Sequence, residues 1–143
     1  MKIAIGADHG GFSYKGKIKN FLTERDIEVL DVGTFSAESC DYPEIAKKVA
    51  NMVSEKIVER GILVCGTGIG MSIVANKVKG VRAALCGDTF SAKATREHND
   101  SNVLCLGERV IDETLMLDIV EIWLDTPFSD EPRHKKRISM IEE

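Results

Sequence analysis

The sequence lacks the features that mark membrane, secreted and nucleic-acid-binding proteins. No apolar run approaches the roughly 18 residues of a membrane-spanning helix, and the apolar stretch in Met1–Gly6 is too short for the core of a secretory signal. The charge is also nearly balanced: 19 basic and 23 acidic residues leave a net charge of −4, which gives no overall field for nucleic acid. We therefore expect a cytoplasmic protein that binds neither membranes nor nucleic acid.

The four cysteines form no C-x-x-C pair, because they lie far apart at positions 40, 65, 86 and 105. This spacing is typical of reduced thiols and not of a zinc site or a disulfide framework. Cys86 and Cys105 lie in apolar, strand-like runs, so we expect both to be small buried side chains. Cys65 differs from them because a glycine-rich segment follows it directly.

The length and the residue composition are those of one globular domain. The chain has 143 residues, of which 43% are hydrophobic and 29% are charged. A chain of this length buries enough surface to fold without a disulfide or a metal ion. We therefore expect residues 1–143 to form a single domain.

Short β-rich runs alternate with longer amphipathic runs along the chain. Strands are expected at Ile3–Ala7, Ile27–Val32, Gly61–Cys65, Val81–Cys86 and Asn102–Leu106. Helices are expected at Phe12–Glu24, from Pro43 to about Ile57, and at Met71–Val78, Thr89–His98, Asp112–Leu124 and Arg133–Met140. Such a βαβ series predicts a parallel five-stranded sheet with helices on both faces.

Ligands of open parallel sheets bind beyond the carboxyl ends of the strands. Polar segments follow four of the five expected strands: Asp8-His9, Cys65–Gly70, Gly87-Asp88 and Gly107–Arg109. We expect these segments to share one rim of the sheet.

The segment Cys65–Gly70 contains three glycines and precedes an expected helix. Such a loop turns its N–H groups inward, so it can hold a phosphate, a carboxylate or an oxyanion formed during a reaction, and it favours the thiolate form of a cysteine beside it. The alternative is a tight turn that needs glycine only for packing. The loop does not match the dinucleotide G-x-G-x-x-G fingerprint or Walker A, and Met71 stands where a phosphatase loop needs arginine.

Each of three other polar clusters has more than one possible role. Asp8-His9 could transfer protons or bind a sugar phosphate, or Asp8 could cap the next helix. His98-Asn99 ends a helix, where a histidine commonly interacts only with the helix dipole. Arg133 and Arg137 are four residues apart, so they share a helix face that could grip a phosphate or simply face solvent.

Taken together, these segments resemble type B ribose-5-phosphate isomerases, whose family also contains galactose-6-phosphate and allose-6-phosphate isomerases. The resemblance covers essentially the whole chain and rests on motifs in the same order, namely Gly6–Gly11, Asp41–Pro43, Cys65–Gly70, Ala75–Lys77, Arg96–Asp100 and Arg133-x-x-x-Arg137. It implies a Rossmann-like three-layer α/β/α sandwich with a C-terminal basic helix, assembled as a homodimer or a dimer of dimers.

The implied reaction interconverts D-ribose 5-phosphate and D-ribulose 5-phosphate through an enediolate, in the non-oxidative pentose phosphate pathway. The resemblance implies neither a metal nor an organic cofactor. Two alternatives stay open: an isomerase of allose 6-phosphate or galactose 6-phosphate, and a phosphosugar-binding module without turnover. Cys65 favours an enzyme, because a binding module needs no nucleophilic thiol beside its glycine loop.

The resemblance also implies residue roles. Family members use as base either a cysteine at the position of Cys65 or a glutamate at the position of Met71, and this sequence has the cysteine. His98 and Thr67 would open the sugar ring, and Asp8 would aid proton transfer between hydroxyls. The substrate-binding set would be His9, Tyr42, Gly66, Gly68, Ile69, Gly70, Asn99, Arg109, Arg133 and Arg137, with the phosphate held by His9 and the three arginines. In the family, His98 and Asn99 come from one chain and Cys65 from the other.

Overall fold

Five parallel strands form the central sheet in the order β2-β1-β3-β5-β4. The computed structural model describes every residue from Met1 to Glu143. The strands are β1 (Lys2–Ala7), β2 (Glu28–Asp31), β3 (Arg60–Cys65), β4 (Ala83–Leu85) and β5 (Val103–Gly107). The order places β1, β3 and β5 inside the sheet and leaves β2 and β4 at its edges.

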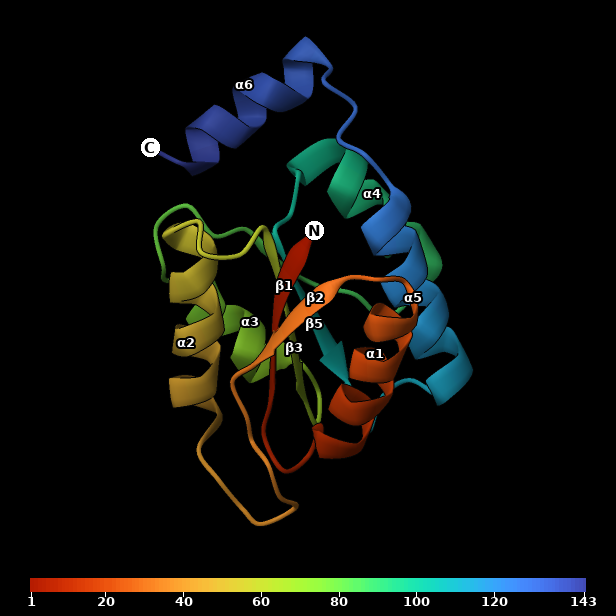
Figure 1. The fold of residues 1–143 in the computed structure, drawn as a ribbon. Coiled ribbons are helices and arrows are strands. Elements are labelled where there is room, and N and C mark those ends of the chain that lie inside the picture. The colour runs from red at the N-terminus through yellow and green to blue at the C-terminus, as the bar shows by residue number, and fades with distance from the viewer.

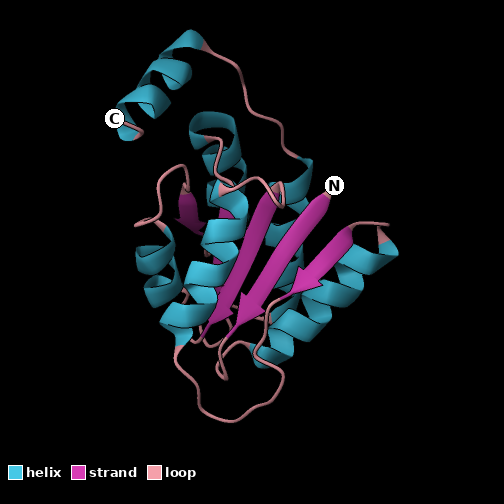
Figure 2. Cartoon of the chain, turned by 60° about the vertical axis from the view of Figure 1, so that its left-hand side comes forward, coloured by secondary structure: helices cyan, strands magenta, loops and turns pink.

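Helices cover both faces of the sheet, as Figures 1 and 2 show. The helices are α1 (Phe12–Glu24), α2 (Tyr42–Ser54), α3 (Ile69–Ala75), α4 (Thr89–Asn99), α5 (Glu113–Asp125) and α6 (Pro132–Ile141). Side chains of α1, α4 and α5 join one hydrophobic cluster with the sheet, and those of α2 and α3 join a second cluster on the other face. α6 lies outside the layers and packs against α4. The predicted three-layer α/β/α sandwich is therefore confirmed.

The inner strands are buried along almost their whole length. Because both faces of a parallel sheet are covered by helices, its strands carry continuous apolar runs and not alternating patterns. Leu104 and Leu106 of β5 accordingly face the first cluster, and Val103 and Cys105 face the second. Cys105 and Cys86 are fully buried, as expected from the sequence. None of the six helices is both long enough and apolar enough to cross a membrane.

Several expected elements have different bounds in the structure; for example, the strand expected at Ile27–Val32 is Glu28–Asp31. The strand expected at Val81–Cys86 is only Ala83–Leu85, because β4 is an edge strand that pairs with β5 alone. The helix expected at Met71–Val78 is Ile69–Ala75. It ends early because the Asn76 side chain bonds both the N–H and the C=O of Ala83, which closes the connection to β4.

The second helix is also shorter than its apolar pattern suggests. α2 ends at Ser54, and the chain turns at Lys56, where φ is 59°. Ile57 was expected on the buried face of this helix, but it is half exposed, and Val58 fills the core in its place. The predicted helix Phe12–Glu24 is confirmed, as is the cap Asp112, whose side chain accepts the N–H of Leu115 at 2.8 Å.

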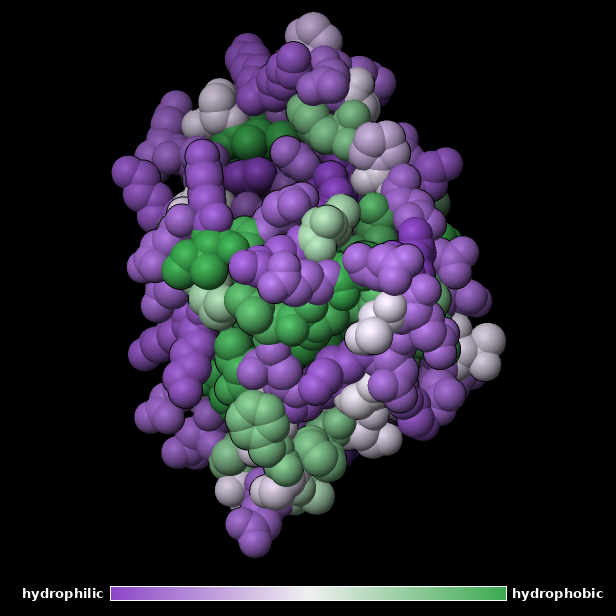
Figure 3. All heavy atoms as spheres, viewed as in Figure 1, coloured by the Kyte–Doolittle hydropathy of each residue, from purple (hydrophilic) through white to green (hydrophobic).

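Figure 3 shows how polarity is distributed over one side of the molecule. Hydrophilic side chains cover the outer faces of the helices in this view. Apolar side chains gather in the middle, between α1 and α2, where the sheet and its flanking helices meet.

Candidate functional site

The strand order creates a crevice between the ends of β1 and β3. The chain leaves β1 for β2 on one side and returns to β3 on the other side. Such a topological switch point is where parallel α/β sheets bind ligands. Two predicted loops meet there: a Cβ atom added at Gly10 would lie 3.1 Å from the backbone nitrogen of Gly66.

Cys65 ends β3 at this crevice, and its side chain is almost buried. Its Sγ atom accepts a hydrogen bond from the N–H of Gly68 at 3.0 Å. A backbone N–H donor at the start of a helix stabilises negative charge on sulfur. The sulfur is therefore held toward the glycine loop in a position suited to a thiolate.

The glycine loop presents several backbone donors. Gly68 caps α3 in the left-handed conformation (φ 80°), which places the loop before the helix N-terminus. The N–H of Ile69 donates a hydrogen bond to the Thr67 hydroxyl at 3.2 Å, whereas the N–H groups of Gly66, Thr67 and Gly70 donate no hydrogen bond within the chain. These three free N–H groups form a candidate site for an oxyanion.

Asp8 and His9 lie on the neighbouring loop. Asp8 Oδ1 accepts the N–H of Gly10 at 2.8 Å, and α1 has no side-chain cap, so the helix-capping alternative for Asp8 is wrong. His9 Nδ1 accepts the N–H of Cys40 at 3.3 Å. In a neutral imidazole this bond leaves the proton on Nε2, which is then a donor for an anion.

Two longer side chains lie over the glycine loop. The Arg109 N–H donates to the Gly66 carbonyl at 3.0 Å, and the guanidinium crosses Gly66, where an added Cβ would lie 3.2 Å from Nη1. The Tyr42 ring covers Gly70, where an added Cβ would lie 2.6 Å from ring carbons. Glycine at position 70 leaves room for the Tyr42 ring. The two side chains bring a cation and a phenol hydroxyl to the crevice.

The remaining predicted residues lie at the opposite end of the molecule. α4 runs back along the sheet, so His98 and Asn99 at its end lie near the amino ends of the strands, beside α6 (Figure 1). Arg133 and Arg137 are exposed on α6. One chain therefore brings Cys65, Thr67, Asp8, His9, Tyr42 and Arg109 together, but it does not bring these four residues to them.

His134 was not singled out from the sequence. Its ring is buried and stacks on that of His98, with centroids 4.5 Å apart and an interplanar angle of 18°. Its Nε2 atom has no hydrogen-bond partner. Burial, together with the nearby His98 and Arg133, lowers the pKa of His134, which favours a neutral ring. No local sequence signal joins two histidines 36 positions apart.

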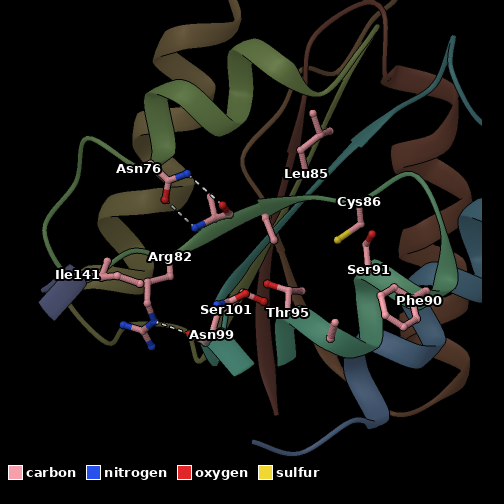
Figure 4. A pocket seen from close by; sticks show the side chains of 13 residues that line it. Asn76, Arg82, Leu85, Cys86, Phe90, Ser91, Thr95, Asn99, Ser101 and Ile141 are labelled. Atoms are coloured by element: carbon pink, nitrogen blue, oxygen red, sulfur yellow. Dashed lines mark hydrogen bonds between the residues drawn. The ribbon is translucent and has the colours of Figure 1, made fainter. Parts of the chain in front are cut away.

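Two hollows adjoin these regions. One of about 350 Å³ borders Thr67 and Ile69 at the end of the glycine loop. A second, of about 480 Å³, lies along the exposed edge of β4 between α4 and α6, and its lining includes Leu85, Phe90 and Asn99 (Figure 4). No group of three or more His, Cys, Asp or Glu side chains is arranged to hold a metal ion.

Comparison with known proteins shows which family the sequence matches. Residues 3–141 match the sequence model of the ribose/galactose isomerases. A putative sugar phosphate isomerase of Bacillus subtilis, YwlF, is 55% identical over 99% of this chain and 95% of its own length. Ribose-5-phosphate isomerase B of Escherichia coli is 47% identical over 98% and 93%. The solved structure of Clostridium thermocellum ribose-5-phosphate isomerase B superposes with a TM-score of 0.97 at 51% identity, covering 99% of this chain and 95% of that one.

Proposed function

The chain belongs to the ribose/galactose isomerase family, and we propose that it is an aldose–ketose isomerase that interconverts D-ribose 5-phosphate and D-ribulose 5-phosphate. This reaction is a step of the non-oxidative pentose phosphate pathway. The four free cysteines support a cytoplasmic location, where thiols stay reduced.

The observation that carries the proposal is the position of Cys65. Its sulfur accepts the Gly68 N–H beside three unused backbone donors. An aldose–ketose isomerase needs a base for a proton on carbon and donors for the oxyanion that the proton leaves behind. A phosphosugar-binding module would need the donors and not the thiolate.

The proposed reaction moves protons among the substrate, Cys65 and Asp8 and needs no other reactant. The Cys65 thiolate removes the C2 proton of the open-chain aldose, and the C2–H electron pair moves to form the C1=C2 bond of the enediolate. The free N–H groups of the glycine loop stabilise the developing negative charge on the C1 oxygen. Asp8 moves a proton from the C2 hydroxyl toward the C1 oxygen, and Cys65 returns its proton to C1, which yields the ketose and a free thiolate.

Ring opening and phosphate binding need the residues at the other end of the chain. We assign ring opening to His98 with Thr67, phosphate binding to His9 and Arg109 together with Arg133 and Arg137, and sugar contacts to Asn99 and Tyr42. His98, Asn99, Arg133 and Arg137 would come from a second copy of the chain, so the proposed enzyme is a homodimer or a dimer of dimers.

Apolar side chains on the surface support such an assembly. Ile69, Leu85 and Val110 line the 350 Å³ hollow, and Phe90, which is 81% exposed, lines the 480 Å³ hollow beside β4. Exposed apolar patches on globular proteins commonly mark association surfaces. A two-fold interface uses the same patch on both copies. Such an interface would place the His98 end of each copy beside the Cys65 end of the other copy.

The test is a comparison of three substrates. The purified protein is expected to isomerise ribose 5-phosphate with a kcat/KM at least about tenfold above those for allose 6-phosphate and galactose 6-phosphate. A higher kcat/KM for either hexose phosphate would replace the pentose assignment. Tight binding of all three without turnover would contradict an enzyme altogether.

A further inference from the structure

We propose that Arg82 is a positioning residue for the isomerase reaction, because its guanidinium joins the His98–Asn99 turn to the helix that carries Arg133 and Arg137. This assignment rests on the proposed function. Arg82 contacts Asn99 only at its backbone carbonyl and none of the side chains assigned to the chemistry, so it would act through the two elements that it connects.

The guanidinium donates three hydrogen bonds, and its Nη2 also lies 3.8 Å from Asp100 Oδ2. Nε donates to the carbonyl of Asn99 at 2.8 Å, and Nη2 donates to that of Asp100 at 2.9 Å. Nη1 donates to Glu142 Oε1 at 2.6 Å, at the end of α6. Figure 4 shows the Arg82 side chain directed to Asn99, with Ile141 of α6 beside it. A planar five-donor fork suits this arrangement, whereas a lysine ammonium would not reach all three acceptors.

The end of α4 needs such a partner. The last carbonyls of a helix have no intrahelical donor and carry partial negative charge. Asp100 also leaves the helix in the left-handed conformation (φ 45°), which exposes these carbonyls to Arg82. By binding both carbonyls, Arg82 fixes the backbone at the end of α4, from which the side chains of His98 and Asn99 project.

α6 is held to the rest of the chain near both of its ends. Near its start, His134 stacks on His98, and at its end Glu142 pairs with Arg82. The Arg82 side chain is 17% exposed and that of Glu142 is 29% exposed, so the pair is partly shielded from water. Arg137 lies between the two attachments and has no carboxylate within 4 Å on its own chain. Its direction therefore depends on how α6 is docked.

Arg82 itself is fixed by its backbone. Its N–H donates to Asn102 Oδ1 at 2.8 Å, and its carbonyl accepts the N–H of Asn102 at 3.0 Å. These bonds anchor Arg82 between β4 and the start of β5. The side chain consequently starts from a rigid point, and it transmits that position to both elements.

Steady-state kinetics with ribose 5-phosphate separates the contact of Arg82 with α6 from its contacts with the end of α4. Glu142→Ala removes only the contact with α6, so KM should rise about threefold to tenfold while kcat stays within about twofold. Arg82→Met removes the contacts with both elements, so KM should rise similarly and kcat should also fall about tenfold. Glu142→Gln keeps an acceptor for Nη1 and should recover part of the KM. Glu143→Ala, next along the chain, is the matched control and should behave as wild type.

The double variant Arg82→Met/Glu142→Ala tests whether the two residues act as one unit. Its KM should not exceed that of Arg82→Met alone, because the shared contact is already lost. A purely structural role would lower the folded fraction, which reduces the apparent kcat of both variants and leaves KM unchanged; that result would overturn the assignment. An unchanged KM in Glu142→Ala, with an active wild type, would overturn it as well. A wild type without activity on any of the three sugar phosphates would instead overturn the proposed function, and this assignment with it.

Discussion

One sulfur atom carries the proposed proton transfer between C2 and C1. Cys65→Ala removes this base and leaves the backbone donors of the glycine loop in place. We expect kcat to fall by about 100-fold or more while KM changes only a few-fold, since general-base contributions are typically of that size. Steady-state kinetics of a variant with the wild-type circular dichroism spectrum would measure this loss.

Cys105 provides the control for this variant. It belongs to the same face of the sheet but is fully buried, and burial raises the pKa of its thiol well above the usual range. Cys105→Ala should therefore lower stability and leave kcat close to wild type. A Cys65→Ala protein that keeps more than about a tenth of the wild-type kcat would exclude Cys65 as the base.

Asp31 makes the stability of the fold depend on pH. Lys15 Nζ donates to both of its oxygens, at 2.8 and 2.9 Å, and also to the Thr34 carbonyl. Burial alone would raise the pKa of Asp31, but the hydrogen bonds from Lys15, the Gly33 N–H and Lys19 outweigh it and lower the pKa. The ionised carboxylate therefore stabilises the segment that follows β2 and leads toward Tyr42.

The sign of the effect follows from the lowered pKa in the folded state. Its contribution is fully present above the unfolded pKa of about 3.9 and is lost as the pH falls through the lower folded value. Asp31→Asn should thus reduce the free energy of unfolding by about 2–4 kcal/mol at pH 7, because Lys15 is left buried without its counter-charge. Urea unfolding should show this gap closing as the pH falls below about 4. Glu113→Gln, which removes the charge of an exposed partner of Lys17, should leave the free energy of unfolding close to wild type, because water screens the pair.

The helix α6 offers two arginines that differ in their surroundings. Arg133 Nε contacts Glu131 at 2.8 Å, whereas Arg137 has no carboxylate partner. Arg137→Ala should therefore raise KM for ribose 5-phosphate by about tenfold to a hundredfold, as expected for the loss of one charge-assisted phosphate contact. Competitive inhibition by phosphorylated sugar analogues, measured as an inhibition constant, should weaken by the same factor.

Lys135→Ala is the neighbouring control on the same helix. Lys135 faces Asp130 at 3.8 Å and is largely exposed, so its loss should leave KM nearly unchanged. Equal, small changes in the two variants would mean that α6 only presents a solvated basic face. The phosphate would then have to be held by His9 and Arg109 without help from α6.

The order and type of every element could be predicted from the sequence, but several of the boundaries could not. Helical spacing of apolar residues identifies α1, and a continuous apolar run identifies β3, because each of these patterns lies within the element itself. The end of α3 depends instead on Asn76 bonding Ala83, and the length of β4 depends on its having one partner strand. Both are contacts between separate segments, which local patterns do not contain.

The same division applies to the candidate site. The loops at Asp8 and Cys65 could be placed together because the carboxyl ends of parallel strands share one edge. The stacking of His134 on His98 and the contacts of Arg82 with Asn99 could not, because they depend on how α6 docks. The resemblance to known isomerases added residue roles, and those roles stay predictions until the variants are measured.

The whole chain carries the proposed site residues in two groups at opposite ends. If each site takes Cys65 from one copy and His98 from another, two inactive variants should complement each other. Cys65→Ala and His98→Asn, mixed by unfolding and refolding together, should recover about a quarter of wild-type activity. Half of randomly mixed dimers are hybrids, and each hybrid has one intact site of two.

Each variant refolded alone is the control and should stay inactive. Hybrid formation is measured independently by native mass spectrometry with a tag on one variant. Hybrids that form without regaining activity would show that Cys65 and His98 act within the same chain. The proposed sharing of each site between two copies would then be wrong.

The strand order also has a consequence for synthesis on the ribosome. β5 is the last strand in the chain, and it pairs with both β3 and β4. β4 therefore has no partner strand until β5 has been made. The nascent chain can therefore complete β2-β1-β3 while the other edge of β3 waits unpaired for residues up to Gly107. At roughly 5–20 residues per second this edge stays open for a few seconds. During that interval the open edge of β3 presents unpaired N–H and C=O groups, which are a template for pairing with a strand of another chain.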